Sequence, residues 1–368
     1  MPPRPTISDV ARAAGVSKGA VSFALNDRPG VGDATRARIL AAAAELGWTP
    51  SHRARALSSS RAMTVGLVVA RAPETLSADP FFPAFIAGIE TTLAERGQAL
   101  LLQVVPDQDS ERRSYQTLAA NGRVDGVFLT DLRVDDPRPA LLELLGLPTV
   151  VIAPSGLKSP WPIVAIDDRP GIAAAVEHLA SLGHRRIAHV AGPAEFVHTR
   201  SRHEAWAMAL TTAGLDDAVS VYSDFSPAGG AAATRQLLDS PERPTAIVYA
   251  NDLMAIAGMS AAQTRGLHVP KDLSVTGFDD TAIAGHLRPP LTTVRTDVVS
   301  WGRVAAESLL RLVEGVPCPD LMLSPPELVL RASTAGPASS PPPPSTIPAG
   351  HTRRPHRSPR PATETDTA

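Results

Sequence analysis

The chain has 368 residues, 43% of them hydrophobic, and a formal net charge of −2, which are ordinary values for a folded globular protein. Its single cysteine, Cys318, excludes an intrachain disulfide framework, and no apolar run is long enough to span a membrane. The N-terminus also lacks an apolar leader, so we expect a cytoplasmic protein.

Two short helices joined by a tight glycine turn are predicted at the N-terminus. Thr6 is a favourable N-cap, and Asp9 places an acid in the first turn of a helix that continues with apolar residues at helical spacing. Gly15 ends this helix, and Ser17 caps a second one from Lys18 to about Asn26. This arrangement is typical of a helix-turn-helix.

The second helix carries an aromatic side chain on its outer face. Val21 and Leu25 form the buried stripe, and Phe23 lies roughly 200° round the helix from them. Residues on or beside that outer face are Lys18, Gly19 and Ser22. Such a face suits the major groove of DNA, where lysine meets guanine acceptors and an aromatic edge meets a thymine methyl. The alternative is that Phe23 packs on a neighbouring domain.

A third helix is predicted from Asp33 to Leu46, with an inner face of Ile39, Ala42, Ala43 and Leu46. Trp48 is expected to close the small core. Residues 51–58 then form a basic segment that is too short to hold as an isolated helix. On DNA it could fold and push Leu57 between base pairs in the minor groove. The alternative is an ordinary basic linker.

These residues carry a specific resemblance. The chain resembles the lac-repressor (LacI/GalR) family of bacterial transcription regulators in the runs T-I-S-D-V-A-R-A-A-G-V-S, A-L-N-D-R-P-G-V-G-D-A-T-R-A-R-I-L, E-L-G-W-T-P and R-A-L-S. The similarity continues almost to Thr334. It implies a homodimer, a palindromic double-stranded DNA operator and a small-molecule effector. The expected DNA-binding residues are Thr6, Ser17, Lys18, Gly19, Ser22, Phe23, Asn26, Arg53, Arg55 and Leu57.

The chain departs from the family pattern at three positions. Gly19 and Phe23 replace the longer polar or arginine side chains that members usually carry in the reading helix, and Ser51 replaces the usual asparagine at the start of the hinge. The operator of a well-studied member therefore cannot be transferred. We expect a helix-turn-helix domain at 1–50, a hinge at 51–61, a two-lobed effector-binding and dimerisation domain at 62–334, and a tail at 335–368.

Charge is distributed unevenly along the chain. Residues 1–61 hold nine Lys or Arg against four Asp or Glu, whereas the remainder holds 26 basic and 33 acidic residues. A basic head on an acidic body indicates phosphate-backbone binding at one end only.

From Met63 onward, strands alternate with helices, which predicts parallel, doubly wound sheets. The pattern restarts at a strand over 163–166, so we expect two α/β lobes of periplasmic-binding-protein-like architecture. The segment 293–312 is expected to cross back to the first lobe, and 328–334 to form the last strand. Residues 335–368 include nine prolines among 34 residues, predict a disordered tail, and contain no leucine heptads for a tetramerising coiled coil.

Candidate ligand contacts follow the strands of the body, because strand ends face the cleft in open α/β folds. Asn251 and Asp279 each follow a predicted strand, and Arg202 starts a helix. An amide, a carboxylate and a guanidinium suit a sugar or another polyol. By resemblance these three contact effector, and Phe81, Phe82 and Phe225 stack on it. The remaining expectations are Asp167 as strand-end cap or ligand contact, Asp252 and Asp280 as helix caps, Phe85 and Trp206 as core, and His184 as structural.

No catalytic or metal-binding motif accompanies these residues. The sequence has no nucleophile elbow, P-loop, dinucleotide fingerprint or Cys/His cluster at metal spacing, so we expect neither an enzyme nor a cofactor. The prediction is a ligand-controlled regulator, a repressor of carbohydrate use. The alternative is a solute-binding protein for a sugar transporter, which would need export and has no use for residues 6–58. Deleting residues 1–61 separates the two, since only DNA binding should vanish.

Overall fold

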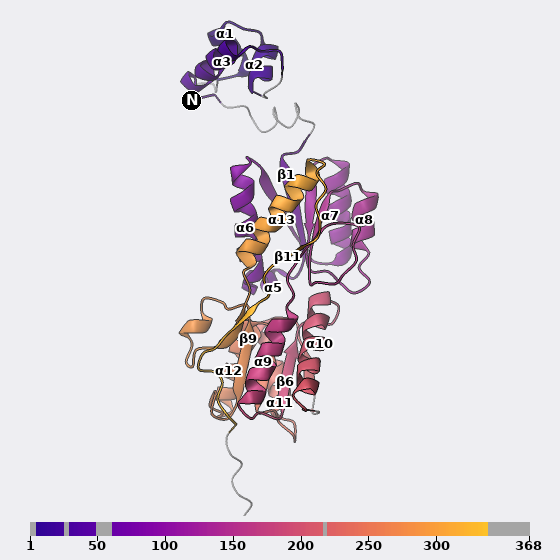
Figure 1. The fold of residues 1–368 in the computed structure, drawn as a ribbon, viewed down its shortest axis with the longest axis vertical. Helices are drawn as coiled ribbons and strands as arrows, with labels where there is room; N and C mark the ends of the chain where they lie inside the picture. The colour runs from indigo at the N-terminus through magenta and orange to yellow at the C-terminus, as the bar shows by residue number, and fades with distance from the viewer. Residues whose placement is uncertain (1–4, 26–28, 49–60, 216–218, 338–368) are drawn as a thin grey trace, which may run out of the picture. The chain divides into compact units, whose positions relative to one another are not determined.

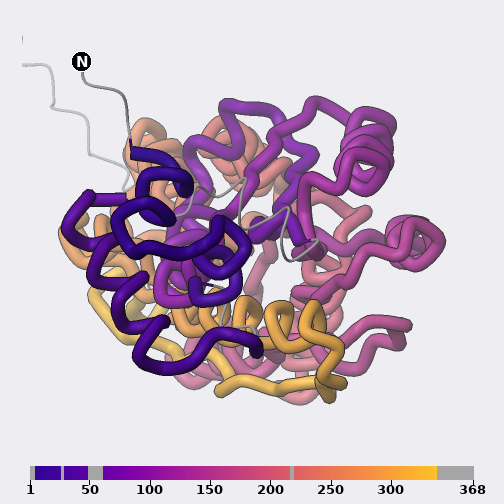
Figure 2. The backbone as a smooth tube through the Cα atoms, turned by 90° about the horizontal axis from the view of Figure 1, so that it is seen from above, coloured from indigo at the N-terminus to yellow at the C-terminus, as the bar shows by residue number. Residues whose placement is uncertain are grey.

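The computed structural model describes residues 5–25, 29–48, 61–215 and 219–337. The head has the three expected helices, α1 (Ile7–Ala14), α2 (Lys18–Leu25) and α3 (Asp33–Glu45), which form the indigo coils of Figure 2. They pack around Val10, Val21 and Ile39, with Trp48 against the same cluster as predicted. The prediction that Leu46 belongs to the inner face of the third helix is wrong, because its side chain is exposed.

The helix ends of the head are fixed by local hydrogen bonds. The backbone N–H and the hydroxyl of Thr6 both donate to Oδ2 of Asp9, at 2.9 and 2.7 Å, and these bonds lower the pKa of Asp9. The hydroxyl of Ser17 accepts from the N–H of Ala20 at 3.1 Å. Gly15 ends α1 at a φ of 62°, which glycine adopts without strain. The sequence signals at 6–17 therefore act locally.

The first lobe is built on one six-stranded parallel sheet (Figure 1). In spatial order its strands are β11 (Leu321–Met322), β5 (Ile163–Ala165), β4 (Thr149–Ala153), β3 (Gly126–Leu129), β1 (Thr64–Ala70) and β2 (Ala99–Val105). Helices α6 (Phe81–Glu95) and α13 (Val298–Val313) pack on one face, and α7 (Gln108–Ala120) and α8 (Arg138–Leu144) on the other. Phe85 is core, as predicted.

The second lobe repeats this architecture with a different edge. Its strands in spatial order are β12 (Glu327–Val329), β10 (Thr292–Arg295), β9 (Ser274–Phe278), β8 (Ala246–Tyr249), β6 (Ile187–Ala191) and β7 (Ser220–Tyr222). All are parallel except β12, which runs antiparallel to β10. Helices α9 (Arg169–Ser181) and α10 (Val197–Thr212) cover one face, and α11 (Pro227–Leu238) and α12 (Asp252–Thr264) the other. Trp206 is core, as predicted, and His184, which was predicted to be structural, is buried.

Two sequence predictions about the body need correction. The strand at 163–165 does not begin the second lobe, because β5 pairs with β4 in the first sheet. The last strand covers only 327–329 instead of 328–334. A short helix, α5 (Pro73–Ala78), precedes α6. Local periodicity does not report which sheet accepts a short strand.

The chain passes between the lobes after β5, after β10 and after β11. The second passage returns the chain to the first lobe, as predicted, and places α13 beside α6; Figure 1 shows this orange helix among the purple elements of the first lobe. Three connections therefore link the two lobes. Within the described residues, no helix is long and apolar enough to cross a membrane.

Candidate functional site

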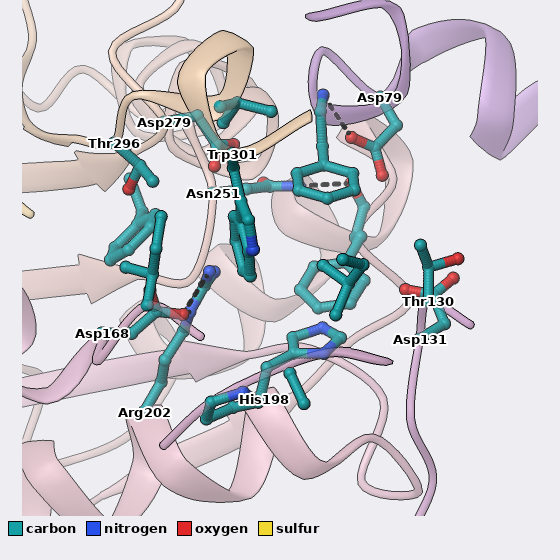
Figure 3. Close-up of a pocket in the computed structure, with 18 of the residues that line it drawn as sticks. Asp79, Thr130, Asp131, Asp168, His198, Arg202, Asn251, Asp279, Thr296 and Trp301 are labelled. Carbon is teal, nitrogen blue, oxygen red and sulfur yellow. Dashed lines mark hydrogen bonds and ion pairs between the residues drawn. The ribbon is translucent and has the colours of Figure 1, made fainter. Parts of the chain in front are cut away.

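A cavity with an empty volume of about 770 Å³, its open mouth included, lies between the two lobes (Figure 3). Its wall combines strand ends and helix starts of both lobes, as expected for open α/β sheets. The polar lining residues are Arg71, Asp79, Thr130, Asp131, Asp168, His198, Arg202, Asn251, Asp279 and Thr296.

Arg202, on α10, is held by a buried ion pair. Its Nε and Nη2 both lie 2.7 Å from Oδ2 of Asp168, and its Nη1 donates to the carbonyl of Ala250 at 2.8 Å. A dashed line marks the contact of Arg202 with Asp168 in Figure 3. The guanidinium also stacks over the ring of Phe278, 3.8 Å from its centroid. These contacts fix the side chain in one position at the floor of the cleft.

Arg71, directly after β1, is held by carboxylates of the first lobe. Its Nε and Nη2 donate to both oxygens of Asp131 at 2.6 and 2.7 Å, and its Nη1 donates to Asp79 at 2.6 Å. Burial alone would raise the pKa of Asp131, but the charge of Arg71 outweighs it and the pKa is lowered. The same guanidinium lies over the rings of Phe196 and Phe225 in the second lobe, so it joins the two lobes.

Aromatic rings form two walls of the cavity. Phe81 at the start of α6 meets Trp301 of α13 edge to face, at a centroid distance of 5.8 Å. On the other lobe, the ring of His198 stacks on Phe196 and Phe225, at 5.3 and 5.6 Å. Flat apolar walls of this kind accept the C–H face of a sugar ring, while polar edges bind its hydroxyls.

Asp279 presents a carboxylate without a partner. In the structure's described part, its side chain makes no hydrogen bond or ion pair, while its backbone N–H donates to Val294 at 2.8 Å. Its φ is 110°, a conformation that aspartate rarely adopts. Burial, and then the charge of Asp252, raise the pKa of Asp279 well above its usual range. A group held in this way is a candidate ligand contact.

Two carboxylates beside the cleft differ from the prediction that they cap helices. Asp252 accepts hydrogen bonds from the hydroxyl of Thr293 and from the N–H and hydroxyl of Thr281, at 2.5 to 2.9 Å. Asp280 instead pairs with Arg295 and Arg331. The cap of α12 is Asn251, whose Oδ1 accepts from Met254 N–H and whose Nδ2 donates to the carbonyl of Phe225. Both acids anchor the turn that carries Asp279.

In the head, the predicted reading face is open to solvent. Lys18 and Gly19 are exposed, Ser22 is half-buried, and the side chain of Phe23 is 41% exposed at the edge of α2. The Phe23 ring lies near Gly30, because a Cβ built on that glycine would be 3.5 Å from Cδ2 of the ring. Thr6 and Ser17 lie at the starts of α1 and α2. Asn26, Arg53, Arg55 and Leu57 lie outside the described residues, as do most of the tail and the hinge.

Comparisons with known proteins identify both parts of the chain. A family model described as bacterial regulatory proteins, lacI family, matches residues 6–51, and one described as a periplasmic binding protein-like domain matches 176–334. The transcriptional regulator CelR of Thermobifida fusca is 37% identical over 316 residues, which are 85% of this chain and 93% of the relative. The chain belongs to the lacI family of bacterial regulatory proteins.

Further relatives and solved structures support the same family. The ribose operon repressor of Escherichia coli (strain K12) is 33% identical, over 84% of this chain and 93% of its own. A solved complex of CelR with cellobiose matches with a TM-score of 0.69 at 35% identity, over 90% of this chain and all of that one. The lac repressor dimer bound to operator matches with a TM-score of 0.78 at 30% identity and the same coverage. This chain is a DNA-binding transcriptional regulator and not an enzyme.

Five of the seven predicted effector contacts of this lacI-family chain line the cavity, and two do not. The five are Phe81, Arg202, Phe225, Asn251 and Asp279. Phe82 is buried in the core of the first lobe, and Asp167 pairs with the exposed Arg169 away from the lining. Sequence analysis missed Arg71, Asp131 and Asp168, although Arg71 and Asp131 follow β1 and β3 closely enough for the strand-end rule to have found them.

The buried His198 in the cleft is expected to make the stability of the fold sensitive to acid. Burial first, and then the charge of Arg202, lower the pKa of His198 from 6.5 to about 3. The unfolded chain therefore binds the extra proton below pH 6.5, so stability is present above that pH and lost as pH falls through the window from 6.5 to 3. At pH 5.5 this residue costs about 1.4 kcal/mol. His198→Phe keeps the ring stack, so we expect a smaller drop in melting midpoint between pH 7.5 and 5.5, measured by calorimetry. An unchanged drop would contradict this assignment.

Proposed function

We propose that this chain is a cytoplasmic, dimeric repressor that binds a palindromic operator and is controlled by a sugar in the cleft between its lobes. One observation carries the proposal: a helix-turn-helix with an exposed reading face belongs to the same chain as an aromatic-walled polar cavity. The relatives support this proposal. CelR has been solved in complex with cellobiose, one relative is named a ribose operon repressor, and the lac repressor dimer has been solved bound to its operator.

The proposed effector contacts are the five predicted residues that line the cavity. Arg202, Asn251 and Asp279 offer a guanidinium, an amide and an open carboxylate to hydroxyl groups. Phe81 and Phe225 offer ring faces from opposite lobes. A ligand that touches both lobes favours one lobe arrangement through its differential affinity. That shift would separate the hinge segments at 51–61 of the two protomers and favour the DNA-free state.

A direct test measures DNA binding with and without sugar. Fluorescence anisotropy with the DNA upstream of the protein's own gene should give a sequence-specific, salt-sensitive complex, because phosphate contacts release counterions. Adding the cognate sugar should weaken that complex. Absence of any complex that outcompetes random DNA would overturn the proposal.

Phe23 is expected to provide sequence specificity. Phe23→Ala should weaken operator binding about 10- to 100-fold, because base contacts specify whereas phosphate contacts position. Binding to random DNA should change little. The matched control is Leu40→Ala, which removes an apolar side chain of similar exposure, 48%, from α3. Equal losses on operator and random DNA would show that Phe23 does not reach the groove.

We propose that the homodimer uses the edge of the first sheet. Leu102 and Val104 alternate on the outermost strand, β2, with 44% and 41% of their side chains exposed. Exposed apolar edge strands invite pairing with another chain. Leu102→Lys with Val104→Lys should therefore shift the protein to monomers in light scattering, while Leu144→Lys, at an 84% exposed position on α8, should not. A dimer unaffected by the double change would place the interface elsewhere.

A further inference from the structure

The two arginines of the cleft are already neutralised by the protein. Arg71 uses three N–H groups on Asp79 and Asp131, and Arg202 uses two on Asp168 and one on the carbonyl of Ala250. The side chains of Arg71 and Arg202 are only 8% and 13% exposed. Within the described residues, the lining of the cavity therefore offers no cation that lacks a carboxylate partner.

The remaining titratable groups add no positive charge. His198 stays neutral above about pH 3, because burial and the charge of Arg202 lower its pKa. Asp279, whose side chain has no partner within the described residues, adds no positive charge either, and burial raises its pKa well above the usual range. A ligand would thus meet one carboxyl group that has no side-chain partner, and it would find no unpaired cation to bind an anion.

We propose that this cleft selects an uncharged polyhydroxylated ligand, which donates hydroxyl hydrogen bonds to Asp279, and that it excludes the phosphorylated or carboxylated forms of the same sugar. The inference deepens the proposed sugar-controlled function and rests on it. Its physical basis is that a phosphate or carboxylate loses its hydration on entering the cavity and regains no charge partner there. A neutral sugar loses less hydration, and its C–H face packs on Phe81 and Phe225.

Matched pairs of ligands test this exclusion. Calorimetric titration of the full chain would compare cellobiose, glucose and ribose with glucose 6-phosphate, glucuronate and ribose 5-phosphate. At least one neutral sugar should bind, and its charged form should bind at least about 30-fold more weakly. A charged form that binds equally or more tightly would overturn the inference and leave the sugar-controlled function standing. If none of the six binds, the sugar effector itself is wrong, whereas operator binding is tested separately.

A variant that frees Arg202 from its carboxylate partner is expected to gain affinity for the charged ligand. Asp168→Asn keeps the shape of the side chain but removes the charge that neutralises Arg202. In this variant, the affinity ratio of phosphorylated to neutral sugar should rise at least about tenfold, because Arg202 becomes available to the phosphate. Each ratio is measured within one protein, so a partial loss of folded protein cancels. An unchanged ratio in Asp168→Asn would show that charge does not set the selectivity.

Discussion

Replacing Arg202 by methionine is expected to abolish ligand binding to the cleft and to destabilise the protein by about 3–5 kcal/mol. The change leaves the carboxylate of Asp168, whose side chain is only 6% exposed, without its counter-charge. It also leaves the carbonyl of Ala250 without its donor and removes the guanidinium from the ring of Phe278. Urea unfolding and calorimetric titration would measure the two losses.

A matched ion pair a short distance away serves as the control. Arg169 pairs with Asp167 at 2.7 Å, but its side chain is 56% exposed, and exposed pairs contribute about 0–1 kcal/mol. Arg169→Met should therefore leave stability nearly unchanged, and ligand binding as well, since neither partner lines the cavity. Comparable effects of the two substitutions would mean that burial does not distinguish the pairs.

Gly88→Ala is expected to destabilise the first lobe by roughly 3 kcal/mol or more, because it overpacks a helix contact. A Cβ at this position of α6 would lie 2.0 Å from the carbonyl oxygen of Val299 on α13. Gly302 shows the reciprocal fit, with the carbonyl of Phe85 2.2 Å from its own Cβ position. In an open helix, glycine to alanine would instead stabilise by up to about 1 kcal/mol, so the sign of the effect is decisive.

The control for this substitution is Gly285→Ala. A Cβ there meets only Nε of Arg331, at an ordinary 3.8 Å. Its melting midpoint should remain close to that of the wild type, while Gly88→Ala should lower the midpoint by roughly 6–12 °C for a lobe of this size. A stable Gly88→Ala protein would show that the two helices separate at little cost.

Much of the head could be predicted from sequence because its signals are local. Thr6, Asp9, Gly15 and Ser17 act within a few residues of themselves, and the helices begin and end where these residues indicate. The outward direction of Phe23 followed from helical geometry alone. Leu46 was wrong, because the helix ends one residue earlier, at Glu45, and the side chain turns outward.

The cleft could be predicted only in part. The strand-end rule found Asn251 and Asp279, since each lies directly beyond a strand of the second sheet. The strand-end rule does not tell which of two residues adjacent in sequence turns its side chain toward the cavity. Phe82 follows Phe81 in sequence, yet it points into the core while Phe81 faces the cavity.

The sequence by itself determined the family, the helix-turn-helix and the alternation of strands and helices, because each depends on residues close together in the chain. Only the tertiary structure decided that β5 joins the first sheet, that α6 and α13 meet through glycines, and that the cleft's arginines are neutralised. Arg71 and Asp131 are 60 residues apart, and Arg202 and Asp168 are 34 apart. Partners at such separations are chosen by the folded packing of two sheets, which no local pattern encodes. The reading face near the N-terminus thus follows from sequence, whereas the charge balance of the cleft that is proposed to control it follows from the fold.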